Sequence, residues 1–195
     1  MRLMNASSGM ALLALGLCVG GCASNTPMRF YTLTAMGAGA ADDTPPTIQV
    51  ARVTLPGEID RSELVQRIDA TRLNLAEQDQ WAAPLAEMIR RTLSADLQAR
   101  LSGGPSQSSP TPSSPTSDAD SLYVDIEEFI ADAKCTVTLR AAWSLKPANT
   151  AMAAKRGHET IRVDPAGSCE VSALPEAMSR ALDEFSGRVV SGRMK

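Results

Sequence analysis

The sequence predicts an α+β fold, in which a mostly antiparallel sheet carries two amphipathic helices on one face. Three observations lead to this class. The expected elements follow the order strands, helix, strands, helix. Residues 134–146 alternate between apolar and polar side chains, as in a strand with one buried and one wet face. Residues 85–101 and 174–189 each place apolar side chains on one stripe with helical spacing.

The chain begins with the features of an export signal, because Arg2 precedes an apolar run over residues 10–19. The run is too short to cross a bilayer core of roughly 30 Å, which needs about 20 apolar residues. Two glycines directly before Cys22 resemble the lipobox of bacterial lipoproteins. The resemblance implies that residues 1–21 are a lipoprotein signal peptide. The alternative is an ordinary secretory signal that contains a cysteine.

The lipobox resemblance also implies a lipid anchor. Cys22 would carry a diacylglycerol on its thiol, and its freed amine would carry an acyl chain such as palmitate. Residues 22–46 would then be the lipidated N-terminus and a tether, interrupted by a short strand at residues 30–33. We expect one domain over residues 47–195. Its first strand, residues 48–55, changes its apolar face partway, which indicates a bulge or a bend.

A hairpin and a helix are expected next. The hairpin strands are residues 64–68 and 72–75. Asp79 is a candidate N-cap of the helix. Residues 102–120, which are rich in Ser and Pro, are expected to be a disordered insertion. The apolar stripe of this helix consists of Trp81, Leu85, Met88, Ile89, Leu93, Leu97 and Leu101.

The second half of the chain predicts three strands and a helix. The strands are residues 121–130, 134–146 and 155–163. In the first of them the alternation slips at Glu127 and Glu128, which indicates a bulge. The helix covers residues 173–191 and has one apolar stripe.

The cysteines favour a disulfide and disfavour a metal site. Cys18 leaves with the signal and Cys22 would be lipidated, so Cys135 and Cys169 remain. Beyond an export signal the compartment permits disulfides, and we expect these two residues to pair. The alternative is two buried thiols that act as small apolar groups. No metal or cofactor is expected, because His158 is the only histidine and the sequence contains no Cys-x-x-Cys spacing.

The residue inventory disfavours nucleic-acid binding and catalysis. The net charge of −3 and the lack of a basic run provide no electrostatic footprint for nucleic acid. The sequence contains none of the common hydrolase or phosphate-binding motifs. A periplasmic hydrolase would have to use Asp125, Glu127 or His158, which are better explained as solvated side chains on strand faces. We therefore expect a binding or scaffolding protein and not an enzyme.

Several segments, taken in order, resemble the ABC-type transport auxiliary lipoproteins of the PqiC-like (paraquat-inducible protein C) family. The resemblance covers nearly the whole chain after Cys22, although the 102–120 insertion departs from the compact pattern of the family. The matching segments are Phe30-Tyr-Thr-Leu33, Ile48-x-Val50-x-x-Val53-x-Leu55-Pro56, Ile59-Asp60-Arg61, Leu64-Val65-x-Arg67, Trp81-Ala-x-Pro84-Leu85 and Leu139-x-Ala141-x-Trp143.

The family resemblance implies an accessory role in phospholipid transport between membranes. The partners would be an MCE-domain protein, which forms a conduit across the periplasm, and an ABC permease with its ATPase. Because Ala23 follows the cysteine, in place of the aspartate associated with inner-membrane retention, we expect sorting to the outer membrane. The lipidated protein would face the periplasm. Whether it forms a homo-oligomer stays open.

Two further expectations complete the sequence-based interpretation. A loop with Pro, Gly and charged residues is the candidate interface, through Leu55, Pro56, Asp60 and Arg61. The same loop is equally well explained as a structural connection. The alternative function is an envelope assembly lipoprotein that binds an outer-membrane protein or a lipopolysaccharide component, which needs the same anchor.

Overall fold

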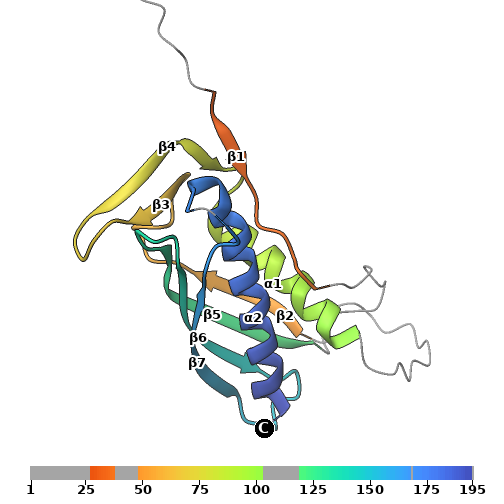
Figure 1. Ribbon diagram of the computed structural model, residues 1–195. Helices are drawn as coiled ribbons and strands as arrows, with labels where there is room; N and C mark the ends of the chain where they lie inside the picture. The colour runs from red at the N-terminus through yellow and green to blue at the C-terminus, as the bar shows by residue number, and fades with distance from the viewer. Residues whose placement is uncertain (1–26, 38–47, 103–118, 168, 195) are drawn as a thin grey trace, which may run out of the picture.

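The structure, a computed structural model, contains among its described residues a mixed sheet of seven strands, two α-helices and a short 3₁₀ helix (Figure 1). It describes residues 27–37, 48–102, 119–167 and 169–194. The predictions for the signal peptide, for Cys22 and for residues 103–118 of the insertion lie outside the described residues. The strands are β1 (Arg29–Tyr31), β2 (Ile48–Thr54), β3 (Glu63–Arg67), β4 (Leu73–Trp81), β5 (Asp120–Ala131), β6 (Val137–Lys146) and β7 (Lys155–Val163). The helices are α1 (Leu85–Ser102), the short 3₁₀ helix η1 (Val171–Ala173) and α2 (Leu174–Met194).

The predicted α+β class is confirmed, but the sheet is mixed. Its strands follow the order β1-β4-β3-β5-β6-β7, and β2 also pairs with β5. The pairs β3/β4, β5/β6 and β6/β7 are antiparallel, as adjacent strands joined by short connections are. The pairs β1/β4, β2/β5 and β3/β5 are parallel. Between β2 and β5 the chain passes through β3, β4 and α1, and a parallel pair needs such a long crossover.

Both helices pack on the same face of the sheet, α1 over β2 and α2 over β6 and β7. Strand β6 buries alternate residues from Val137 to Leu145 and leaves the others at least partly exposed, as its sequence pattern predicts. The β3–β4 hairpin lies across the N-terminal ends of the helices, where Trp81, Leu85 and Leu174 line one small apolar space. The core is therefore one continuous cluster between the sheet and the helices.

Two of the predicted irregularities are confirmed. The register of β2 against β5 shifts between Val50 and Arg52. The register of β5 against β6 shifts between Ile126 and Glu128, where the apolar alternation slips. Each extra residue changes which face the following side chains occupy, so apolar residues stay on the helix side across the bulge.

Two predicted boundaries are wrong. Asp79 and Trp81 belong to β4, and α1 begins only at Leu85. Asp79 is therefore not a helix cap. Strand β6 begins at Val137, because Asp132 accepts hydrogen bonds from the backbone N–H groups of residues 134 and 136 and closes a turn before it. Cys135 lies in this turn with a positive φ of 64°.

Trp143 of β6 requires close approach of the backbone on two sides. A Cβ atom added to Gly157 of β7 would lie 2.5 Å from the indole ring, and one added to Gly192 of α2 would lie 2.8 Å from it. The ring is rigid and buried, so it has little freedom to move aside. Glycine at both positions thus lets the indole fill the space between α2 and β7.

We expect Gly157→Ala to lower the free energy of unfolding by about 1–3 kcal/mol, because the added methyl group overpacks the Trp143 site. Urea denaturation followed by Trp fluorescence measures the change. Gly57→Ala is the matched control, because a Cβ there meets nothing within 4 Å. That control should stay within about 0.5 kcal/mol of the wild type. Equal midpoints for the two variants would contradict the packing argument.

Candidate functional site

The first candidate site is the N-terminal strap, which we define as residues 29–37. Its first part is β1, which pairs in parallel with the end of β4. Asp79 of β4 is 5% exposed and accepts hydrogen bonds from the Arg29 guanidinium at 2.8 Å and from the Tyr31 hydroxyl at 2.8 Å. The backbone N–H of Ala82 donates to the Tyr31 carbonyl. One buried carboxylate thus holds two side chains on the same face of β1.

The charge of Asp79 is stabilised by these partners. Burial raises the pKa of its carboxyl, but the hydrogen bonds from Arg29 and Tyr31 and the Arg29 charge outweigh it and hold the pKa below its ordinary value of 3.8. The folded state therefore binds the Asp79 proton less tightly than the unfolded chain does. Its contribution to stability is present above pH 3.8 and is lost only as the pH falls through the lowered pKa.

The second part of the strap contacts both helices. Leu33 is buried in the core, and the backbone N–H of Thr34 donates to the Ser179 hydroxyl of α2 at 3.1 Å. Asp96 of α1 is fully buried, and its Oδ1 accepts the N–H groups of Met36 at 2.8 Å and Gly37 at 3.1 Å. The strap therefore ties β1 to the helix layer, and its path along α1 and α2 is visible in Figure 1.

Asp96 has only part of its hydrogen-bonding capacity satisfied. Its Oδ2 is buried without a hydrogen-bond partner in the part of the chain that the structure describes. Burial raises the pKa of this carboxyl, and the hydrogen bonds from Gly37 and Met36 counteract the rise only in part. The folded state therefore holds the Asp96 proton more tightly than the unfolded chain. Its effect on stability is opposite in sign to that of Asp79, since ionisation as the pH rises costs stability.

The strap differs from the tether that the sequence predicts over residues 22–46. Residues 29–37 pack on the domain, and the short strand lies at 29–31 where 30–33 was expected. The hydrogen bonds join residues 48 to 145 positions apart in the sequence, so no local pattern reports them. The available signal was the position of Asp96, an acidic residue next to Leu97 on the apolar side of α1. A buried carboxylate needs donors, and the strap provides them.

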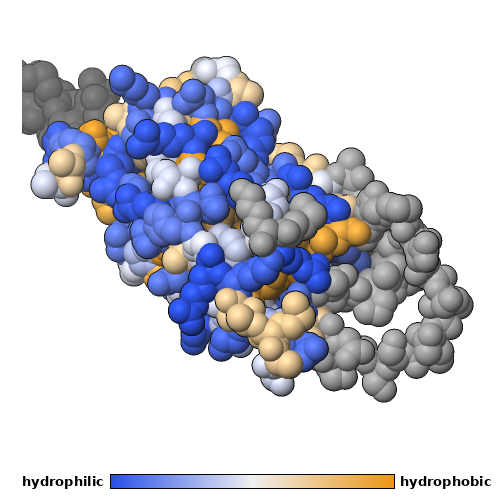
Figure 2. Space-filling view, turned by 90° about the horizontal axis from the view of Figure 1, so that it is seen from below, coloured by the Kyte–Doolittle hydropathy of each residue, from blue (hydrophilic) through white to orange (hydrophobic). Residues whose placement is uncertain are grey.

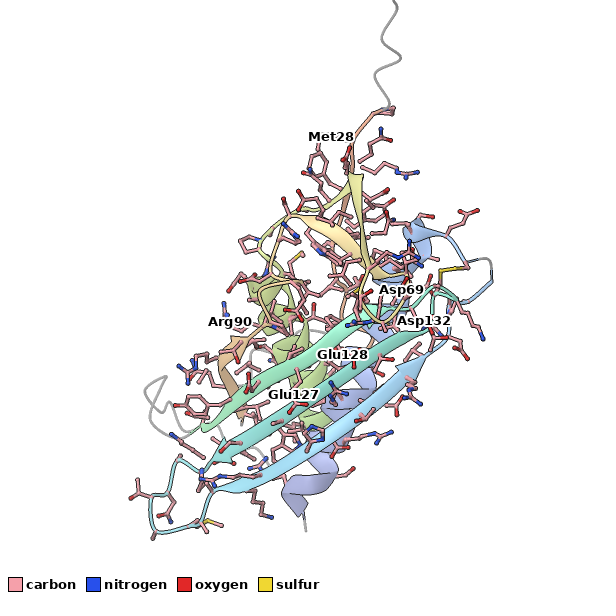
Figure 3. All side chains as sticks on the ribbon, turned by 90° about the vertical axis from the view of Figure 1, so that its left-hand side faces the viewer. Met28, Asp69, Arg90, Glu127, Glu128 and Asp132 are labelled. Carbon is pink, nitrogen blue, oxygen red and sulfur yellow. A yellow bond between two sulfur atoms is a disulfide. The ribbon has the colours of Figure 1, made fainter. Side chains whose placement is uncertain are left out.

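The second candidate site is the open face, the side of β5, β6 and β7 turned away from the helices. Figure 3 shows Glu127 and Glu128 on this face. A chain of ion pairs and one histidine contact crosses it. Arg140 contacts Glu127 at 3.0 Å and Glu128 at 3.4 Å, Arg67 contacts Glu128 at 3.6 Å, and His158 contacts Glu127 at 3.2 Å. Exposed pairs of this kind add little stability, so they mainly organise the surface.

The structure brings together two of the three residues considered for catalysis. His158 lies against Glu127, whereas Asp125 accepts a hydrogen bond from the Thr54 hydroxyl. The bonds from His158 and Arg140 hold the pKa of Glu127 below its ordinary value, although partial desolvation opposes them. A carboxylate that works as a general acid needs the opposite shift and a site that excludes water. The pKa of Glu127 is lowered and not raised, and both Glu127 and His158 are exposed to water.

The predicted interface loop joins β2 to β3. Its turn is closed by backbone hydrogen bonds from Ile59 and Asp60 to the Pro56 carbonyl, and Ile59 is buried. Leu55 and Pro56 are half-buried, whereas Asp60 and Arg61 are exposed. Leu55 also packs against the core. The loop thus has a fixed inner part and presents two charged side chains to solvent.

A disulfide joins Cys135 to Cys169, with a Cα–Cα distance of 5.3 Å. Cys135 is buried in the turn between β5 and β6, and Cys169 precedes η1. The bond connects the end of the sheet to the segment that enters α2. The two cysteines are 34 positions apart in the sequence. Closing a loop of this length stabilises a fold by roughly 3–4 kcal/mol in chain-entropy estimates.

In the described part of the chain, His, Cys, Asp and Glu side chains form no group of three or more that could hold a metal ion. Among the same residues, no helix has both the length and the apolar composition that crossing a membrane requires.

Comparisons with known proteins identify the family of the chain. The family model of the ABC-type transport auxiliary lipoprotein component matches residues 31–190, and the chain belongs to this family. A search of curated proteins finds no match. A solved structure described as an uncharacterised protein is similar in fold, with a TM-score of 0.67 and 19% identity over 84% of this chain and 97% of that one. The protein XCC0632 from Xanthomonas campestris has a TM-score of 0.61 and 18% identity over 83% of this chain and 92% of its own.

We expect Asp79→Ala to accelerate trypsin cleavage after Arg29 several-fold, because β1 loses two side-chain attachments to β4. Mass spectrometry of timed digests measures the rate at this bond. Asp125→Ala is the control, since it removes an exposed carboxylate that does not contact the strap. Unchanged cleavage after Arg29 in the Asp79 variant would contradict the proposed role of this residue. Cleavage within β5–β7 should stay unchanged in both variants, which would exclude global unfolding.

Proposed function

We propose that the protein is an outer-membrane lipoprotein that docks a transport conduit, as a non-enzymatic component of an MCE-type ABC system for phospholipids. The observation that carries this proposal is the family match over residues 31–190, which describes an auxiliary lipoprotein of ABC-type transport. Its partners would be an MCE-domain protein and the ABC permease with its ATPase. The domain would face the periplasm.

The anchor in this proposal is a lipid on Cys22. A single acyl chain gives only reversible membrane binding, because each buried CH₂ contributes about 0.8 kcal/mol, and stable anchoring takes two or more chains. A diacylglycerol with an added acyl chain meets this requirement. The strap begins seven positions after Cys22, so the lipid and the folded domain are joined by a very short segment.

The docking surface in this proposal is the loop between β2 and β3. Ile59 fixes its backbone in the core, so Asp60 and Arg61 are presented without a large loss of conformational freedom on binding. Arg61 contacts Glu63 at 3.6 Å, a longer contact than the 3.0 Å between Arg140 and Glu127 on the open face, so the loop is the preferred surface. Leu55 and Pro56 would form the half-buried margin of the contact.

We expect a photo-crosslinking amino acid at Asp60 or Arg61 to capture an MCE-domain protein in living cells. Mass spectrometry of the crosslinked product identifies the partner. The control position is Glu176, which is exposed on α2 and should give no such product. Capture of an outer-membrane β-barrel protein would favour the envelope assembly function, and capture of neither class would contradict the docking proposal.

We expect the combined variant Asp125→Asn, Glu127→Gln and His158→Gln to support lipid transport as well as the wild type does. The exchanges approximately preserve side-chain size and remove every group considered for catalysis on the open face. Resistance of cells to detergent, with the variant as the only copy, measures the outer-membrane barrier. Loss of that resistance in a variant that is folded and membrane-bound would indicate chemistry on the open face.

A further inference from the structure

Two exposed apolar side chains lie where the described chain begins. Met28 is 50% exposed and Phe30 is 63% exposed, and Phe30 has the largest exposed fraction among the described large apolar residues. Met28 lies at one end of the molecule, beside β1 (Figure 3). A single exposed apolar side chain is ordinary, but here two of them lie together where the described chain begins.

The contacts of Asp79 determine which way Phe30 points. Successive residues of a strand point to opposite faces, and Asp79 holds both Arg29 and Tyr31 on its own face of the sheet. Phe30 is therefore directed to the opposite face, and Met28 directly precedes β1 and is half exposed. Because β1 pairs with β4 from Arg29 to Tyr31, this orientation is fixed and is not an average over a loose end.

The length of chain before Met28 limits what can cover this surface. Met28 follows Cys22 by six positions, so a fully extended segment spans at most about 20 Å and a flexible one averages about 13 Å. The headgroup layer on each side of a bilayer core occupies roughly 5–8 Å of that reach. A lipid on Cys22 therefore allows Phe30 to come within side-chain reach of the headgroups.

We propose that Met28 and Phe30 contact the bilayer directly and orient the domain on the membrane that holds its lipid. The inference rests on the lipid anchor of the proposed function. The apolar face of an interfacial amphipathic helix lies about 5–10 Å deep at the boundary between headgroups and acyl chains, and the side chains of Met28 and Phe30 would reach the same boundary. The contact is apolar and weak by itself, and the tethered lipid makes it effective by keeping the two side chains at the surface. The β6–β7 connection, at the other end of the molecule, then points away from the bilayer (Figure 1).

The opposite end of the molecule also carries an exposed apolar side chain. Viewed from the C-terminal end, the surface is mostly hydrophilic and includes smaller apolar patches (Figure 2). Met152, in the β6–β7 connection, is 62% exposed, which closely matches Phe30. The chain thus offers two equally exposed apolar positions at opposite ends, of which only one lies near the lipid attachment site.

The test uses Phe30→Trp and Met152→Trp in the full lipidated protein, reconstituted in phosphatidylcholine vesicles with or without bromine on the acyl chains. Bromine quenches Trp fluorescence at short range. The native Trp81 and Trp143 are buried, and the wild type in the same vesicles supplies their background. We expect the added emission of the Phe30→Trp variant to fall at least about twofold in brominated vesicles, as insertion to acyl-chain depth requires. The added emission of the Met152→Trp variant should not change.

Flotation of the vesicles tests the lipid anchor separately from the membrane contact of Met28 and Phe30. A protein that floats with the vesicles but shows equal, weak quenching in both variants overturns the membrane contact and leaves the anchor in place. An added emission of Phe30→Trp that is blue-shifted but not quenched by bromine also overturns it, since another protein surface then covers the residue. A protein that does not float overturns both proposals. Acidic lipids are omitted from the vesicles so that the net negative charge of the chain does not oppose binding.

Discussion

The hydrogen bonds accepted by Asp79 and Asp96 hold the two ends of the N-terminal strap on the domain. Both carboxylates are buried, where a charged group is stable only if donors satisfy it. Asp79 has a cationic donor and Asp96 has backbone donors. Ionisation of Asp79 therefore favours the folded state, whereas ionisation of Asp96 costs stability. The attachment of the strap thus does not depend on the titration of one carboxyl alone.

The one-sided arrangement of helices explains the division of surfaces. One face of the sheet is covered by α1 and α2, which also receive the strap. The other face carries ion pairs between β5 and β6, and His158 of β7 contacts Glu127 beside them. The two faces of the sheet therefore differ, since one holds the strap and the helices and the other presents polar side chains.

The local patterns of the sequence predicted much of the fold. Alternation in β6, the apolar stripe of α2 and the slips in β2 and β5 all depend on neighbouring residues, and the structure contains each of them. The attachment of β1 beside β4 could not be predicted in this way, because Tyr31 and Asp79 are 48 positions apart. The prediction of Asp79 as a helix cap is wrong for the same reason. An acidic residue shortly before a helical stripe gives the same local pattern whether it caps the helix or lies in the preceding strand. The contacts of the strap with Asp96 are made by backbone N–H groups. Every residue except proline carries such a group, so the sequence does not indicate these contacts.

Residues 29–37 are part of the folded domain, because they are bonded to β4, α1 and α2. Native-state hydrogen exchange of the wild-type protein, resolved by NMR, tests this claim most directly at the amides of Met36 and Gly37, which donate to Asp96. We expect these amides to exchange as slowly as interior amides of α1, because opening them exposes a buried carboxylate. Exchange at the rate of an unstructured chain, with α1 still protected, would contradict the account.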